Sequence, residues 1–253
     1  MDVRLALLFF FMVGVLGGCV SSHDTDPLKS ESGRNEARDA YVRLGLGYLA
    51  QGDTASAKAP LGSALAIDPG SADAHAALAL VFQREMENSL ADEHFRAALA
   101  HGGDARILNN YGSFLFEQGR YQEAMARFEQ ASADTFYSER ARVFENLGLT
   151  ALRLGQADQA EAHFQRALRL DSRQPLALLE LSQLSFDAGQ YVPAKGYYDA
   201  FSQLSGQNAR SLLLGIRLAQ IHQQPEQAAM LALQLQRLYP GTSEYRQYQS
   251  EQR

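Results

Sequence analysis

The feature that most constrains this chain is a repeat of about 34 residues that runs through nearly its whole length. One alanine recurs at gaps of 34, 33, 36, 34 and 34 residues, at Ala57, Ala91, Ala124, Ala160, Ala194 and Ala228. A small residue precedes each alanine by twelve or thirteen positions, at Gly45, Ala79, Gly112, Gly148, Ser182 and Gly215. Two features at a fixed offset predict one supersecondary unit, used six times.

Each unit has the pattern of a helical hairpin. A large side chain stands directly before each small residue, at Leu44, Leu78, Tyr111, Leu147, Leu181 and Leu214. Another follows each alanine by four residues, at Leu61, Phe95, Phe128, Phe164 and Tyr198, with Ala232 as the exception. Apolar residues at i, i+3, i+4 and i+7 form one face of a helix. Glycines stand where the first helix must end and the chain must turn, at Gly52, Gly119, Gly155 and Gly189.

This all-α pattern resembles the tetratricopeptide repeat, whose helix pairs stack into a right-handed superhelix. Pro69 and Pro240 stand at the terminal proline position of that repeat. The resemblance implies a solenoid over residues 36–241 and a C-terminal tail over 242–253. Its six repeats begin near Arg38, Ala72, Ala105, Ala141, Pro175 and Asn208.

Two repeats depart from the pattern. Repeat six lacks the aromatic residue and has Pro225 at its inter-helix turn, so we expect it to act as an atypical capping repeat. Pro60 falls inside the second helix of repeat one, where its missing N–H and its ring predict a kink. That kink is either a distortion tolerated near the end of the solenoid or a device that reshapes the groove of repeat one.

The N-terminus has the pattern of a secretion signal. The apolar run from Leu5 to Leu16 is too short for a membrane span, and it fits the core of a signal peptide. Leu16, Gly17 and Gly18 precede Cys19, the only cysteine of the chain, and together they resemble the lipobox of bacterial lipoproteins. That resemblance implies removal of residues 1–18 and acylation of Cys19. An ordinary signal peptide beside an unrelated cysteine is the alternative.

The polar segment after Cys19 contains few large aliphatic residues, so we expect residues 19–35 to form a flexible tether between the lipid anchor and the solenoid. Several acyl chains would attach the protein durably to a membrane. The residue after the cysteine is Val20, and not the aspartate that retains enteric lipoproteins in the inner membrane. By resemblance, the expected location is the periplasmic face of the outer membrane.

No catalytic, cofactor or metal motif is visible. The six histidines form no HExxH pair and are spread over different repeats and the tether, and His75 is expected to be a packed core residue. A single cysteine makes no zinc site. The net charge is −6, with no basic run, which argues against a nucleic-acid partner. We therefore expect neither enzyme activity nor a small-molecule substrate or cofactor.

The remaining function is protein binding on the concave surface of the solenoid. In the tetratricopeptide family, residues at fixed positions of the first helix of each repeat line this surface. Carried over to repeat one, these positions place Val42, Leu46 and Leu49 in a partner-binding groove. Neighbouring helices that cover these residues are the alternative. In repeats three and four the same surface takes Asn109, Phe116, Arg142 and Asn146. The asparagines either bind a peptide backbone or satisfy local turns.

The lipobox, the tether and six repeats, with the runs EARDAYVRLGLGYLAQGD and QNARSLLLGIRLA, resemble the type IV pilus biogenesis and stability lipoproteins of Gram-negative bacteria. This resemblance implies a pilotin, a lipoprotein that binds subunits of the pilus secretin and promotes their outer-membrane localisation and multimerisation. An adaptor for outer-membrane protein insertion or for peptidoglycan synthesis is the alternative, and a regulator of an envelope enzyme is a third possibility.

Overall fold

The computed structural model describes residues 27–252 of the chain. Over this range it consists of helices, with no strand. A short 3-10 helix, η1 (Pro27–Lys29), precedes the first hairpin. The α-helices are α2 (Glu31–Ala50), α3 (Thr54–Ile67), α4 (Ala72–Arg84), α5 (Asn88–Ala100), α6 (Ala105–Glu117), α7 (Tyr121–Ala133), α8 (Arg140–Arg153), α9 (Ala157–Leu170), α10 (Pro175–Asp187), α11 (Tyr191–Leu204), α12 (Ala209–Ile221), α13 (Pro225–Leu238) and α14 (Ser243–Glu251).

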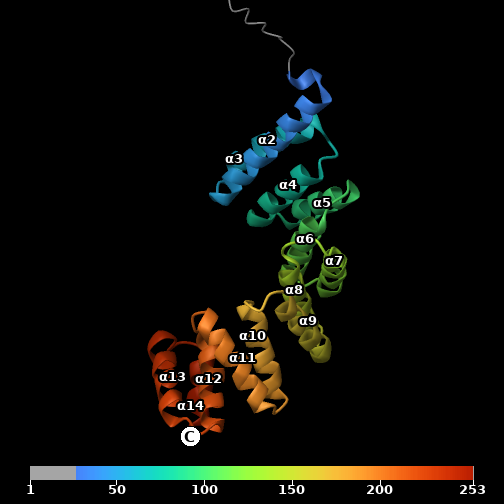
Figure 1. The fold of residues 1–253 in the computed structure, drawn as a ribbon. Helices are drawn as coiled ribbons and strands as arrows, with labels where there is room; N and C mark the ends of the chain where they lie inside the picture. Colours follow the sequence, from blue (N-terminus) through green and yellow to red (C-terminus); the bar gives the residue numbers. More distant parts are fainter. Residues whose placement is uncertain (1–26, 253) are drawn as a thin grey trace, which may run out of the picture.

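Helices α2 to α13 form six hairpins that stack one on the next into an elongated superhelix (Figure 1). Each helix packs on its hairpin partner, and the second helix of a pair also packs on the first helix of the following pair. Repeats two to six begin within one residue of the predicted positions. The predicted fold, a superhelix of six tetratricopeptide repeats, is confirmed.

The first helix is longer than predicted. Helix α2 begins at Glu31, where the Oγ of Ser30 accepts a hydrogen bond from the N–H of Gly33 at 3.0 Å. Residues 31–35, predicted as tether, therefore belong to the helix. Gly33 and the polar composition suggested a linker, but extending an existing helix by about 1.4 turns, with Ser30 as the N-cap, costs little once repeat one has nucleated it. The signal segment, Cys19 and the rest of the tether up to residue 26 lie outside the described residues.

The C-terminal tail is a helix that covers the end of the solenoid. Thr242 caps α14, and the side chains of Tyr245 and Tyr248 pack against a cluster formed by Leu212, Leu213, Ile216 and Leu235. Arg217 of α12 pairs with Glu251 at the other end of α14. The capping role expected of repeat six is thus performed in large part by the helix that follows it.

The small residues of the first helices lie where their hairpin partners leave no room. A Cβ on Gly148 would come within 2.5 Å of the ring of Phe164, and one on Gly112 within 2.6 Å of the ring of Phe128. The two helices of these pairs therefore approach each other closely at the small residue, with the ring four positions after the alanine packed directly on it. Pro60 is buried within α3, and the helix continues through it to Ile67, so the proline does not end the helix.

Candidate protein-binding groove

The concave side of repeats one to four carries three hollows that adjoin one another. The first is lined by Asp39, Val42, Arg43, Leu46, Asp73, Ala77, Leu80 and Arg106. The second is lined by Leu49, Leu80, Gln83, Arg84, Met86 and Glu117. The third is lined by Ser113, Phe116, Glu117, Phe128, Asn146 and Leu149. Since Leu80 belongs to the first two and Glu117 to the last two, the hollows form one groove over α2, α4, α6 and α8.

The floor of this groove is apolar at its N-terminal end. Leu46 is 38% exposed, and Leu49 and Leu80 are half-buried beside it. Met86 follows at the turn after α4 and is 78% exposed. An apolar strip rimmed by charged side chains is the usual composition of a protein-binding site.

Val42 lies at the base of the first hollow, but only 7% of it is exposed. Its side chain packs against Ala64 of α3 and Ala74 of α4. Neighbouring helices therefore cover Val42, as the alternative interpretation expected. A partner in the first hollow would contact mainly Leu46. Leu80 and Met86 also line the groove, although the prediction from the sequence did not include them. Leu80 occupies the same repeat position as Leu46, so the sequence carried that signal, and Met86 replaces the glycine of other repeats.

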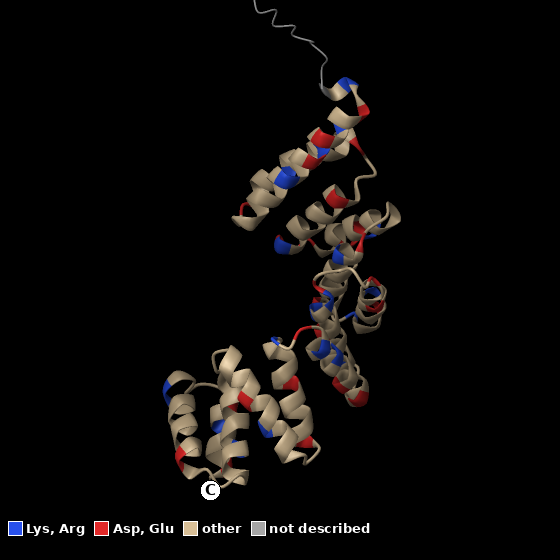
Figure 2. Cartoon of the chain, in the orientation of Figure 1, with Lys and Arg blue, Asp and Glu red and all other residues tan. Residues whose placement is uncertain are grey.

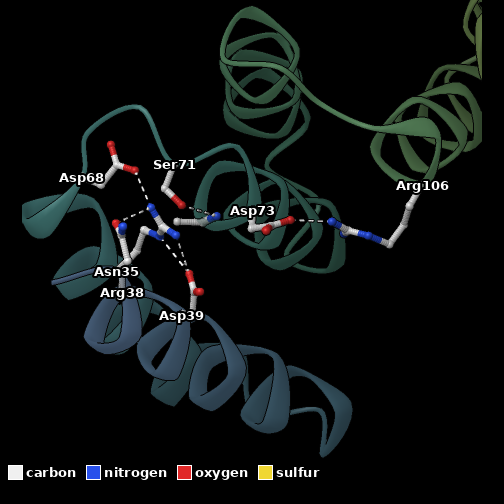
Figure 3. Close-up of polar contacts among 8 residues, drawn as sticks. Asn35, Arg38, Asp39, Asp68, Ser71, Asp73 and Arg106 are labelled. Carbon is white, nitrogen blue, oxygen red and sulfur yellow. Dashed lines mark hydrogen bonds and ion pairs between the residues drawn. The ribbon is translucent and has the colours of Figure 1, made fainter. Parts of the chain in front are cut away.

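A polar network fixes the wall of the groove between repeats one and two (Figure 3). The guanidinium of Arg38 donates to Asp39 at 2.8 Å, and it also donates to Asn35 and to Asp68, each at 3.1 Å. The hydrogen bond to Asp39 is the largest of the effects that raise the pKa of Arg38. Since Asp68 lies in the loop before α4, this cation ties α2 to the start of the next repeat.

Further polar contacts join successive first helices across the groove. Arg106 of α6 pairs with Asp73 of α4 (Figure 3). Arg84 donates to the carbonyl oxygen of Leu49 at 2.6 Å, and Gln83 donates to Glu117 at 2.7 Å. These bonds hold α2, α4 and α6 in register, so the apolar floor is largely preformed.

The predicted residues of repeats three and four are only partly brought together. The amide of Asn146 donates to the Oδ1 of Asn109 at 2.9 Å, and Asn109 is buried. This pair joins α6 to α8, so Asn109 is structural, whereas Asn146 and Phe116 line the third hollow. Arg142 lies in a separate hollow with Tyr137, Glu139 and Asp171.

Three histidines expected to lie apart meet in repeat two. His75 and His94 approach to 2.9 Å between their Nδ1 atoms, and His101 stacks on His75 with centroids 6.2 Å apart. The hairpin brings α4 beside α5, which sequence spacing alone did not reveal. No group of three side chains suited to a metal ion occurs within residues 27–252. In the same part of the chain, no helix has the length and apolar character needed to cross a membrane.

Basic and acidic residues are interspersed along the described solenoid (Figure 2). This charge distribution lacks the basic stripe of a nucleic-acid-binding surface. The arrangement therefore matches a scaffold that binds proteins through an extended concave surface.

Known proteins share this architecture and much of this sequence. Models of the tetratricopeptide repeat match residues 39–71, 103–173 and 145–209. Type IV pilus assembly protein PilF of Pseudomonas aeruginosa is 58% identical over 252 residues, which cover 99% of this chain and 100% of PilF. A solved structure of PilF matches with a TM-score of 0.84, covering 87% of this chain and 99% of that one.

PilW, described as a widely conserved type IV pilus biogenesis factor, also matches. The chain in its crystal structure is 31% identical, with a TM-score of 0.72, and the match covers 85% of this chain and 99% of that one. Both likenesses extend over nearly the whole solenoid. The chain therefore belongs to the tetratricopeptide-repeat family of type IV pilus biogenesis proteins that includes PilF.

Proposed function

We propose that the protein is an outer-membrane lipoprotein, anchored through acylated Cys19, that binds subunits of the type IV pilus secretin. In this role it promotes their localisation in the outer membrane and their multimerisation, and so pilus assembly. The observation that carries the proposal is the 58% identity to PilF over almost the whole of both chains.

The geometry of the groove supports a chaperone-like role. A subunit of a membrane ring exposes apolar surface and unpaired strand edges before the ring closes, and such surfaces aggregate in water. The strip of Leu46, Leu49, Leu80 and Met86 offers an apolar counterpart, while the surrounding ion pair and hydrogen bonds fix its shape. Binding alone suffices for this role, so the protein acts without catalysis or a cofactor.

Two variants test the groove and the anchor in cells. Leu46→Glu places a charge on the exposed part of the apolar floor and should reduce the abundance of secretin multimers severalfold. Leu233→Glu is the matched control, since Leu233 is 54% exposed on α13, far from the groove. Cys19→Ala should leave secretin in the inner-membrane fraction. Secretin multimers are measured by gel electrophoresis of fractionated membranes.

A polar change at Val42 is avoided because that side chain is buried and its replacement would unfold repeat one. If secretin multimers form normally in both Leu46→Glu and Cys19→Ala cells, the proposal fails. Copurification of a cell-wall synthesis enzyme or of the outer-membrane insertion machinery in place of secretin would then favour the adaptor function.

A further inference from the structure

The N-terminal end of the solenoid presents an open apolar surface on α2. Leu44 is 48% exposed and Tyr41 is 39% exposed. Ala40 and Gly47, one turn to either side of Leu44, are exposed as well. We call these four residues the end face. It lies on the side of α2 opposite Val42 and Leu49, which pack toward α3 and α4.

The equivalent position is covered in every other repeat. Leu44 corresponds to Leu78, Tyr111, Leu147, Leu181 and Leu214, whose exposed fractions are 7%, 3%, 1%, 0% and 1%. The cover in each case includes the second helix of the preceding repeat. Leu147, for example, lies in one cluster with Phe128 and Ala131 of α7. Repeat one therefore carries one side of a repeat–repeat interface without the other, and the described chain before α2 supplies only residues 27–30.

The two ends of the solenoid differ in this respect. At the C-terminal end, α14 packs Tyr245 and Tyr248 over the last hairpin. Terminal repeats of a solenoid normally carry such a polar-faced cap, because an exposed repeat interface is an association surface. The end face lacks this cap among residues 27–252.

Gly47 adds an independent observation. A glycine inside a helix costs about 1 kcal/mol relative to alanine. Packing inside repeat one explains Gly45, because a Cβ there would come within 2.5 Å of Leu61. A Cβ on Gly47 would meet no atom within 4 Å, so internal packing does not explain this glycine. The equivalent positions of repeats two and three carry Val81 and Phe114, which are buried in the internal interfaces, so Gly47 leaves that space on the end face for a side chain of the occupant.

We propose that the end face binds an α-helix of a partner protein, seated as the second helix of a missing preceding repeat. The five internal interfaces specify its chemistry. The covering helices present a bulky apolar residue and another apolar residue one turn later, as in Phe128 and Ala131, Phe164 and Ala167, or Tyr198 and Phe201. The partner helix carries such a pair on an uncharged stripe. This surface is separate from the concave groove, so the inference does not depend on the proposed function.

A defined probe tests the proposal on the full chain in a non-ionic detergent. The probe is a stapled helical peptide with the sequence of residues 121–133, the helix that covers the equivalent face of repeat four. It should bind saturably, and Leu44→Asp should weaken binding by about tenfold or more, as expected for loss of one buried leucine. Gly47→Ala should stabilise the free protein and leave binding of this peptide unchanged, because repeat four, which α7 covers, carries the larger Thr150 at the equivalent position. Leu233→Asp, at an exposed leucine of α13, is the matched control for Leu44→Asp and should also leave binding unchanged.

Three results would overturn the inference. The peptide fails to bind, or binds Leu44→Asp and the wild type equally well. Size-exclusion chromatography with light scattering shows a dimer that Leu44→Asp dissociates, which makes the occupant a second copy. A photoreactive residue at position 44 crosslinks to residues 1–26 of the same chain, which makes the occupant the N-terminal segment.

Discussion

At the scale of single residues, the turn between the two helices of a hairpin contains a residue with positive φ, a backbone conformation that most side chains disfavour. Gly52, Gly119, Gly155 and Gly189 have φ values between 72° and 84°, a region that glycine enters without strain. In repeat two the same position is Met86, with φ of 63°. A non-glycine residue there costs about 1–2 kcal/mol, and in this chain it places an apolar side chain on the groove.

Met86→Gly should therefore raise the free energy of unfolding by roughly 0.5 kcal/mol, because relief of backbone strain exceeds the added flexibility of the unfolded chain. Urea denaturation followed by circular dichroism measures the change. The reverse change, Gly119→Met, should lower the free energy of unfolding. An unchanged or lower stability of Met86→Gly would mean that the methionine side chain packs more favourably than its exposure indicates.

The histidine pair of repeat two makes stability depend on pH. The Nε2 of His75 lies 3.0 Å from the carbonyl oxygen of Pro69, so this nitrogen carries the proton, and the Nδ1 of His75 accepts from the Nδ1–H of His94. Burial, and then the proximity of His75, lower the pKa of His94. The folded state thus binds fewer protons than the unfolded state below the ordinary histidine pKa of about 6.5.

Stability should consequently fall as the pH drops below about 6.5, by at most about 1.4 kcal/mol per pH unit for each such histidine. His94→Gln should reduce this slope between pH 7 and pH 5 in urea titrations, whereas His222→Gln, outside the pair, serves as the control. An identical slope in wild type and His94→Gln would show that other groups, such as half-buried His163, account for the pH dependence.

At the scale of elements, the helix pairs of repeats three and four each pack one glycine against one ring of the partner helix. Gly148→Ala should lower the free energy of unfolding by about 2 kcal/mol, because its Cβ would lie within 2.5 Å of Phe164, whose ring is fully buried. Gly62→Ala in α3 is the matched control, since its Cβ would meet nothing within 4 Å, and it should stabilise the protein. Thermal and urea unfolding compare the two, and equal effects would contradict the close-packing argument.

At the scale of the whole molecule, stability is distributed along the solenoid, because each repeat contacts only its neighbours. Removal of residues 242–253 exposes the apolar cluster of Leu212, Leu213, Ile216 and Leu235. Local opening of α12 and α13 should become easier by roughly 2 kcal/mol, with repeats two and three unaffected. Hydrogen exchange by mass spectrometry resolves the repeats. A uniform rise in exchange along the chain would show a single cooperative unit instead.

The sequence by itself determined the number of repeats, the starts of five of them and four of the six turns. Each of these features depends only on residues close together in one hairpin. The spacing of apolar residues and the backbone preferences of glycine are therefore enough to predict them. It did not reveal that α2 begins at Glu31 or that the tail forms α14, because polar composition does not separate a linker from a helix docked on its neighbour.

Only the tertiary structure decided which residues of different repeats meet. It buried Val42 against α3 and α4, paired Asn146 with Asn109, gathered His75, His94 and His101, and left Leu44 exposed at one end. All four outcomes depend on the small rotation and translation between successive elements. That offset arises from how whole helices pack side by side, and no single segment of the sequence encodes it.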